Sequence, residues 1–449
     1  MPAFLFLVTF AIRFQYCIFM NPIRKQTSDF ARTLYYAIHG HFETPAVDFY
    51  QFFTHKFYHG FFLYYFGFRS QLRVYFLQCV YVGFIAVLIY FIGKRIRDER
   101  LGLLAATLYV LWPTQTLYQS QTSEEHPAAL IAAALIFLLI DMAQRLETLD
   151  AAENFWEQVQ KNKRLLGRFV CIGILCGLSP LFKDWAAIIL TAALLCSVYL
   201  LFHFHKHQRI WLAIGFFLIF ALRTGVHSYF TQMAEREFDA KVGGAIVVAQ
   251  MYETMDPEFS TGDLKHDMPL MNEYRQMVRD YGYDFSAANR EALAILGQKI
   301  SANMDKVPNL LFRKGVAANS STNAVILWSF QGMDSDTRTA FQPLITLLSN
   351  LDQTYYICVI LCILLCAVLC RNRYLYFILL IIVGGITAQL LIENGPRYKY
   401  SIEFAWCLAA AGGLYPLFFS DWTNFRQGLS KQWAKLRKKP DVSANQTET

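Results

Sequence analysis

The sequence predicts an all-α polytopic membrane protein with about ten transmembrane helices. Apolar residues occupy 55% of the 449 positions and charged residues only 17%, whereas a soluble chain of this length carries more charge. Several apolar runs are about as long as a helix needs to cross a bilayer. Basic residues cluster in the gaps between these runs, so the net charge of +7 gives no indication of nucleic-acid binding.

The apolar runs define ten predicted membrane spans. They cover residues 2–20, 72–92, 101–118, 127–143, 168–182, 185–203, 209–226, 354–370, 374–392 and 402–420. The first run contains Arg13 and has neither a basic start nor a small-residue cleavage site. We therefore expect a retained helix there rather than a cleaved signal peptide.

The distribution of basic residues predicts the orientation of the chain. The gaps at 93–100, 161–168, 205–209 and 371–373 are rich in Lys and Arg, whereas the gap at 113–126 contains neither. Because positive gaps face the cytoplasm, both termini are expected there, and the long gaps face outward. The predicted organisation is a membrane core at 1–226 with a first outer loop at 21–71, an extracytoplasmic region at 227–353, C-terminal membrane helices at 354–420 and a basic cytoplasmic tail at 421–449.

Two basic and aromatic segments are expected to lie on membrane lipids. Residues 145–165 and the tail after Trp422 mix Trp, Phe and Leu with charged residues, which suits an anionic leaflet. The chain is compact and shows no retention signal, so we expect a bacterial cytoplasmic membrane rather than the endoplasmic reticulum.

The first outer loop begins with a polar, acid-bearing helix, "TSDFARTLYYAIHGHF" at 27–42. Thr27 or Ser28 is expected to cap it, which leaves Asp29 in the first turn, where the helix dipole favours an ionised carboxylate. This is either plain helix electrostatics or part of a site for a lipid-borne anion. Helical spacing places five polar residues on one side, namely Asp29, Arg32, Thr33, Tyr36 and His39.

Other outward gaps supply further polar residues. Lys56 interrupts an aromatic stretch at 42–68 that otherwise resembles an interfacial belt. Glu124 and Glu125 have no cationic neighbour in sequence, so they are either solvated, which is the default for loop acids, or paired with a distant group.

Cations also stand in two short outward gaps. Lys183 lies in one such gap, and Arg397 and Lys399 lie in "ENGPRYKY" at 393–400. Basic residues at these positions are often interfacial anchors. Convergence of Arg32, Lys183 and Arg397 with the carboxylates of the other gaps would instead create an acid–phosphate site.

The order of these motifs resembles the GT-C superfamily of membrane glycosyltransferases, in the branch of the protein O-mannosyltransferases and the lipid A aminoarabinose transferase. The similar stretches are "HGFFLYYFGFRSQLRVYFLQ" (59–78), "GKRIRDERLGLLAATLYVLWPTQTLYQSQTSEE" (93–125), "GILCGLSPLFKDW" (173–185) and "RYKYSIEFAWCLAAAGG" (397–413). The chain departs from the family in three ways: Asp29 lacks a second adjacent acid, a double proline is missing, and Lys183 replaces the usual Arg.

The resemblance implies an inverting transfer of a sugar from a polyprenyl-phosphate carrier to a hydroxyl group outside the membrane. Asp29 would act as the general base, and Arg32, Lys183, Arg397 and Lys399 would stabilise the phosphate. Glu124 or Glu125 would orient the acceptor, and His39 and Lys56 would complete the substrate site. The acceptor would be a lipid, a glycan or a protein. No metal-ligand spacing is evident and we expect no cofactor, although some relatives of this superfamily use a divalent cation.

Two other functions fit the same composition. A transporter or flippase for lipid-linked sugars would also need cations, but inverted repeats and mid-membrane charges are not evident. A non-catalytic scaffold subunit would use 227–353 for docking. A transferase requires Asp29, Lys183 and Arg397 to meet in one outward cavity, whereas a scaffold does not.

Overall fold

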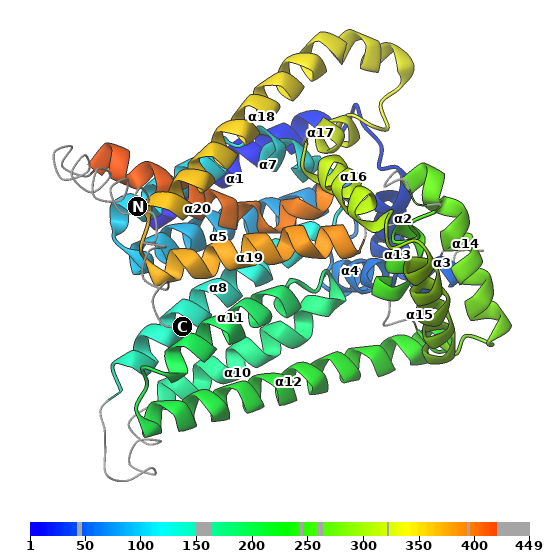
Figure 1. Ribbon diagram of the computed structural model, residues 1–449. Coiled ribbons are helices and arrows are strands. Elements are labelled where there is room, and N and C mark those ends of the chain that lie inside the picture. Colours follow the sequence, from blue (N-terminus) through cyan, green and yellow to red (C-terminus); the bar gives the residue numbers. More distant parts are fainter. Residues whose placement is uncertain are drawn as a thin grey trace, which may run out of the picture.

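The computed structural model describes residues 1–42, 47–149, 163–242, 246–258, 260, 264–320, 323–392 and 396–419. All regular elements in these ranges are helical, which confirms the predicted all-α class (Figure 1). The expected interfacial segment 145–165 lies largely outside the described residues, and the tail 421–449 lies entirely outside them.

Eight helical segments are long and apolar enough to span a membrane, so the chain is a multi-pass membrane protein. They are Pro2–Met20 (α1), Gln71–Ile96 (α5), Glu125–Glu147 (α8), Lys163–Leu181 (α10, Lys163–Leu178, with the 3₁₀ turn η2, Ser179–Leu181), Lys206–Phe238 (α12), Ser335–Leu369 (α18), Arg373–Leu391 (α19) and Arg397–Phe419 (part of η3, Pro396–Ile402, with α20, Glu403–Phe419).

The remaining two predicted spans are shorter helices. Helix α11 (Trp185–Leu201) has 17 residues and α6 (Glu99–Leu111) has 13. The segment expected at 101–118 is divided because Pro113 has no backbone N–H with which to continue the helix. Pro113 instead begins the short helix α7 (Pro113–Leu117), which is followed by the 3₁₀ turn η1 (Tyr118–Ser120).

Small residues allow the central helices to approach one another closely. A side-chain carbon on Gly93 of α5 would lie 2.5 Å from the Cα atom of Gly102 in α6. A side-chain carbon on Gly413 of α20 would overlap the carbonyl oxygen of Cys362 in α18. Both approaches are far closer than van der Waals contact, so larger residues would separate these helices.

The basic gaps meet at one end of the bundle. Asn372 Nδ2 donates to the carbonyl of Ile96 at 2.9 Å, and Gln208 Nε2 donates to the carbonyl of Leu146 at 3.0 Å. At this end three arginines, Arg95, Arg145 and Arg168, surround the buried carboxylate of Asp141.

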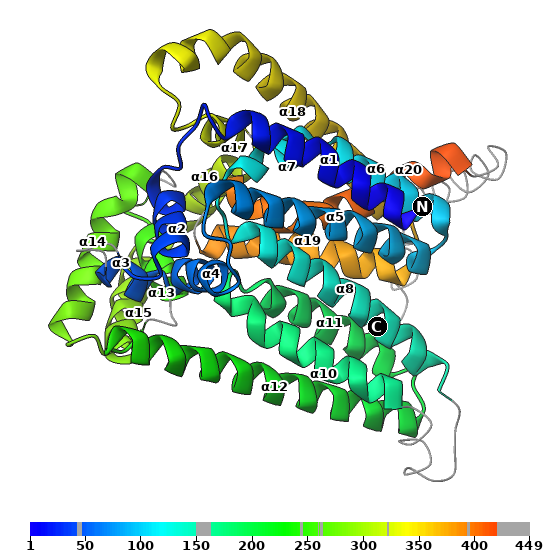
Figure 2. The ribbon, with the colours of Figure 1, turned by 180° about the vertical axis from the view of Figure 1, so that it is seen from behind.

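The opposite end of the bundle carries the shorter helices, as both views show (Figures 1 and 2). These are α2 (Ser28–His39), α3 (Val47–Phe52), α4 (Thr54–Tyr65), α13 (Ile246–Thr254), α14 (Leu264–Asp280), α15 (Phe285–Ala302), α16 (Val307–Asn319) and α17 (Asn323–Ser329). Helices α13–α15 share an apolar core with Phe52 of α3. Lys314 of α16 connects this group to the bundle. Its Nζ atom donates to the hydroxyl group of Thr254 in α13 at 2.9 Å and to the carbonyl of Ile392, which follows α19, at 2.6 Å.

Candidate functional site

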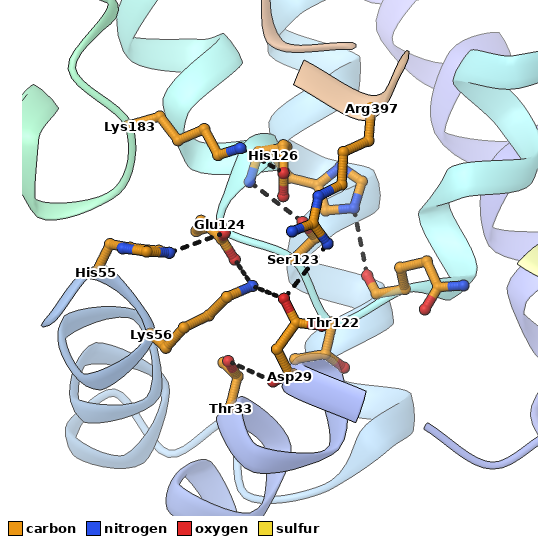
Figure 3. Close-up of polar contacts among 12 residues, drawn as sticks. Asp29, Thr33, His55, Lys56, Thr122, Ser123, Glu124, His126, Lys183 and Arg397 are labelled. Carbon is orange, nitrogen blue, oxygen red and sulfur yellow. Dashed lines mark hydrogen bonds and ion pairs between the residues drawn. The ribbon is translucent and has the colours of Figure 1, made fainter. Parts of the chain in front are cut away.

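Five separate segments bring their polar side chains together at this end of the bundle (Figure 3). Helix α2 supplies Asp29, helix α4 supplies Lys56, and the junction of η1 and α8 supplies Glu124 and Glu125. The remaining two segments are the turn between η2 and α11, which supplies Lys183, and η3, which supplies Arg397. We call these six residues the charge cluster.

Asp29 lies in the first turn of α2, as predicted. Thr27 occupies the N-cap position, but its hydroxyl group makes no capping hydrogen bond. The predicted polar face of α2 is also not a solvent face, because Thr33 and Tyr36 are buried against the rest of the protein. Helix α2 therefore packs on both sides and presents Asp29 to the charge cluster.

Lys56 bridges two carboxylates. Its Nζ atom lies 3.0 Å from Oδ2 of Asp29 and 2.7 Å from Oε2 of Glu124. Lys56 and Glu124 are only 2% and 1% exposed, whereas the Asp29 side chain is 17% exposed. Lys56 therefore joins the partly exposed carboxylate of Asp29 to the buried carboxylate of Glu124.

Arg397 contacts Asp29 from the other side. Its Nη1 atom lies 3.3 Å from Oδ2 of Asp29, and its guanidinium lies 5.0 Å from the centre of the Trp328 ring. Burial by itself would raise the pKa of Asp29, but Lys56 and Arg397 outweigh this effect and hold the pKa well below its ordinary value. Asp29 is therefore ionised at neutral pH.

The second acid, Glu125, pairs with Lys183. Lys183 Nζ lies 2.8 Å from Oε1 of Glu125 and 3.7 Å from the centre of the Tyr398 ring. Burial lowers the pKa of Lys183 against the opposing effect of Glu125 and Glu124. Glu124 and Glu125 are at most 1% exposed. Of the two alternatives for these acids, solvation is therefore wrong, and pairing with a distant group is what the structure shows.

Two histidines flank Lys56. His55 Nε2 lies 3.5 Å from Oε1 of Glu124, and burial lowers the pKa of His55 to about 3. His59 is also buried, and burial lowers its pKa to about 4. Both rings are therefore neutral at pH 7. The charge cluster then contains three carboxylates balanced by three cations.

A layer of buried polar residues, which the sequence did not reveal, holds the loop that carries the two glutamates. Arg24 donates to Gln121 Oε1 at 2.6 Å and to the carbonyl of Gln331 at 2.8 Å. Gln78 Nε2 donates to the carbonyl of Gln121 at 2.8 Å, and Gln26 Nε2 donates to that of Ser120 at the same distance. The signal in the sequence was the run of polar residues after Pro113, which overlaps the end of the span expected at 101–118 and continues through the gap that ends at 126.

Three predicted site residues lie outside the charge cluster. The guanidinium of Arg32 lies over the Phe49 ring at 4.0 Å, and His39 is exposed beside the Tyr35 ring at 4.4 Å. Lys399 is buried, and its Nζ atom donates to the Tyr356 hydroxyl group at 3.2 Å.

A second buried polar group lies on the α20 side. Gln115 Nε2 donates to Oε2 of Glu403 at 2.5 Å, and the Tyr400 hydroxyl group lies 3.1 Å from Nδ1 of His126. His126 follows Glu125 directly in the chain, so this group adjoins the charge cluster. Neither Gln115 nor Glu403 was predicted, because single polar residues in apolar runs carry no pattern.

Neighbouring residues in the turn before α11 have different partners. Lys183 faces Glu125, whereas Asp184 receives a hydrogen bond from Arg223 of α12 at 2.6 Å and another from the backbone N–H of Ala187 at 3.3 Å. Asp184 therefore fixes the start of α11 and leaves Lys183 to the charge cluster.

Among the described residues, no group of three or more His, Cys, Asp or Glu side chains is arranged to hold a metal ion. Between the carboxylates of Asp29 and Glu124 lies the ammonium group of Lys56.

Comparison with known proteins found no matching family model and no matching curated protein. Two solved structures of the oligosaccharyltransferase of the archaeon Archaeoglobus fulgidus are similar in fold, each with a TM-score of 0.41. One, named AglB, is in complex with an inhibitory peptide and a dolichol-phosphate; it is 14% identical, over 83% of this chain and 41% of that one. The other is tethered to an acceptor peptide; it is 15% identical, over 82% of this chain and 43% of that one. The chain thus spans about two fifths of the length of each of these proteins.

Proposed function

We propose that this protein is a membrane glycosyltransferase that moves a sugar from a polyprenyl-phosphate carrier to an acceptor hydroxyl group. The observation that carries the proposal is that Arg397 and Lys56 both contact Asp29. Lys56 also contacts Glu124, and Lys183 contacts the neighbouring Glu125. A transferase of this kind needs one carboxylate and several cations at a single place, and five separate segments supply them there.

In this proposal Asp29 is the general base. An alcohol is a weak nucleophile at neutral pH, and a positioned carboxylate that accepts its proton accelerates attack about 10²–10⁴-fold. The acceptor oxygen forms a bond to the anomeric carbon, and the bond from that carbon to the phosphate oxygen breaks. The electron pair leaves with the phosphate, and the proton passes to Asp29. A single displacement without a protein nucleophile inverts the anomeric centre.

Arg397 and Lys183 are the proposed phosphate ligands. A guanidinium recognises phosphate through paired hydrogen bonds, and fixed cations stabilise the charge that develops on the leaving group. Phosphate binding would also draw Arg397 away from Asp29. Because Arg397 helps to hold the pKa of Asp29 low, this movement would make the carboxylate a stronger base when the donor is bound.

The proposed orientation follows from the two ends of the bundle. The basic gaps meet at the end opposite the charge cluster (Figures 1 and 2). If positive gaps face the cytoplasm, the charge cluster is extracytoplasmic and both termini are cytoplasmic. The assignment to the GT-C superfamily, with Lys183 in place of the usual arginine, is part of the same proposal. The acceptor would be a lipid, a glycan or a protein.

The decisive experiment measures transfer of labelled sugar from a polyprenyl-phosphate donor pool in membranes that contain wild type, Asp29→Asn or Asp336→Asn. Asp336 is an exposed acid in the first turn of α18 and serves as the matched control. We expect Asp29→Asn to lose transfer about 10²–10⁴-fold at equal protein abundance, and Asp336→Asn to lose none. Unchanged transfer by Asp29→Asn would assign the base elsewhere, with Glu124 and Glu125 tested next. If wild type transfers no sugar but moves lipid-linked sugar between leaflets, the protein is a transporter and the proposal is wrong.

A further inference from the structure

Two carboxylates from distant parts of the chain converge on one buried ammonium group. Asp29 comes from α2 and Glu124 from the start of α8, and their oxygens lie 3.0 Å and 2.7 Å from Lys56 Nζ. Lys56 is itself 2% exposed and lies on a third element, α4 (Figure 3). Carboxylate oxygens are the ligands that hard divalent cations such as Mg²⁺ and Ca²⁺ prefer, and here two carboxylates converge on one position.

Lys56 is charged in this position. Burial alone would lower its pKa, but Asp29 and Glu124 outweigh burial and raise the pKa above its ordinary value. Arg397 supplies a second positive charge to Asp29, and His55 supplies only a neutral ring to Glu124. The two carboxylates are thus already neutralised without an added ion.

We propose that Lys56 is a built-in cation that occupies the position a divalent metal ion would otherwise take between Asp29 and Glu124. The intact site then binds no such ion, because a dication next to an immobile ammonium group would experience strong repulsion. Replacement of Lys56 by a small neutral residue leaves the partly exposed Asp29 and the buried Glu124 without their shared counter-charge and with space between them. That variant gains a site for a divalent cation.

This inference concerns the same residues as the proposed transfer reaction and, for its bearing on catalysis, rests on that proposal. Lys56 would make the reaction independent of metal ions. Its test measures ion binding rather than transfer, so failure of one proposal can be distinguished from failure of the other.

The experiment titrates purified full-length protein with Mn²⁺ and follows the free ion by electron paramagnetic resonance. We expect wild type and Lys56→Arg to leave the signal of free Mn²⁺ unchanged. Lys56→Ala is expected to bind about one Mn²⁺ per chain, at least roughly tenfold more tightly than wild type. The double variants Lys56→Ala/Asp29→Asn and Lys56→Ala/Glu124→Gln remove one oxygen ligand each and should lose this gain.

Two results would overturn the inference. One is binding of Mn²⁺ by wild type that Asp29→Asn abolishes, which would show that Lys56 does not exclude the ion. The other is a titration in which the Lys56→Ala variant is folded but binds no more Mn²⁺ than wild type does. If Lys56→Ala is unstable in plain buffer, its melting temperature is measured with and without Mn²⁺. A rise with Mn²⁺ that Lys56→Ala/Glu124→Gln does not show supports the inference, and no rise contradicts it.

Discussion

Arg397 Nη1 lies 3.3 Å from Oδ2 of Asp29, although 368 residues separate them in the chain. The contact joins α2 to the 3₁₀ turn η3, which precedes the last described helix α20. The charge cluster therefore contains residues from near both ends of the sequence. The contact also connects the proposed base to a proposed phosphate ligand.

The first prediction concerns this guanidinium. Arg397→Lys keeps one positive charge but cannot make paired hydrogen bonds to phosphate, so we expect the rate constant for sugar transfer to fall about 10²–10³-fold. The measurement is transfer in membranes at saturating donor. Arg313→Lys, an exposed arginine of α16, is the matched control and should transfer at the wild-type rate. Equal transfer rates for Arg397→Lys and Arg313→Lys would show that Arg397 is not a phosphate ligand.

A second prediction concerns pH. Lys56 and Arg397 hold the pKa of Asp29 below its ordinary value, so in wild type this carboxylate loses its proton well below pH 4 and stays ionised from there upward. Its contribution to stability is therefore present above about pH 4 and is lost only as the pH falls through the lowered pKa. Lys56→Met removes one of the two cations and raises the pKa of Asp29. We expect the acid limb of the pH profile of transfer to move to higher pH in Lys56→Met, and an unmoved limb would argue against Asp29 as the base.

The third prediction concerns the stability of the buried pair Lys56 and Glu124. Removal of one partner of such a pair leaves an uncompensated buried charge, which costs about 3–5 kcal/mol. We expect Glu124→Gln to lower the melting temperature in detergent markedly, and Lys56→Met/Glu124→Gln to be less destabilised than the sum of its single variants. The control is the exposed pair Lys94 and Glu99, whose loss in Lys94→Met should leave the melting temperature unchanged. Additive effects at Lys56 and Glu124 would show that the two groups are not coupled.

The fourth prediction separates Lys183 from its neighbour Asp184. Lys183→Ala should raise the KM for the donor roughly tenfold or more, since a hydrogen bond to a charged group contributes about 1.5–3 kcal/mol. Lys183→Arg should bind the donor within a few-fold of wild type, because it keeps the cation beside Glu125. Asp184→Asn should lower the melting temperature with little change in KM, because Asp184 pairs with Arg223 and caps α11. An equal rise in KM for Lys183→Ala and Asp184→Asn would contradict this prediction, because it would assign both residues the same structural role.

The amino-acid sequence by itself determined the membrane class, eight of the ten predicted spans and the location of Asp29 in the first turn of α2. These features depend on local composition and on helix-end chemistry, which neighbouring residues decide. Local reasoning was wrong where a longer-range partner intervened. Solvation was the default for Glu124 and Glu125 as loop acids, yet both are buried.

Only the tertiary structure decided which charges meet. No sequence spacing relates Lys56 to Glu124, or Lys183 to Glu125, because each pair lies on elements that come together through helix packing. The same packing directs Arg32 and His39 away from the charge cluster and buries Lys399 beside Tyr356. A buried charge is tolerated only with a partner close by. The position of each cation is therefore set by which carboxylate the folded bundle brings within reach, and a linear sequence does not contain that distance.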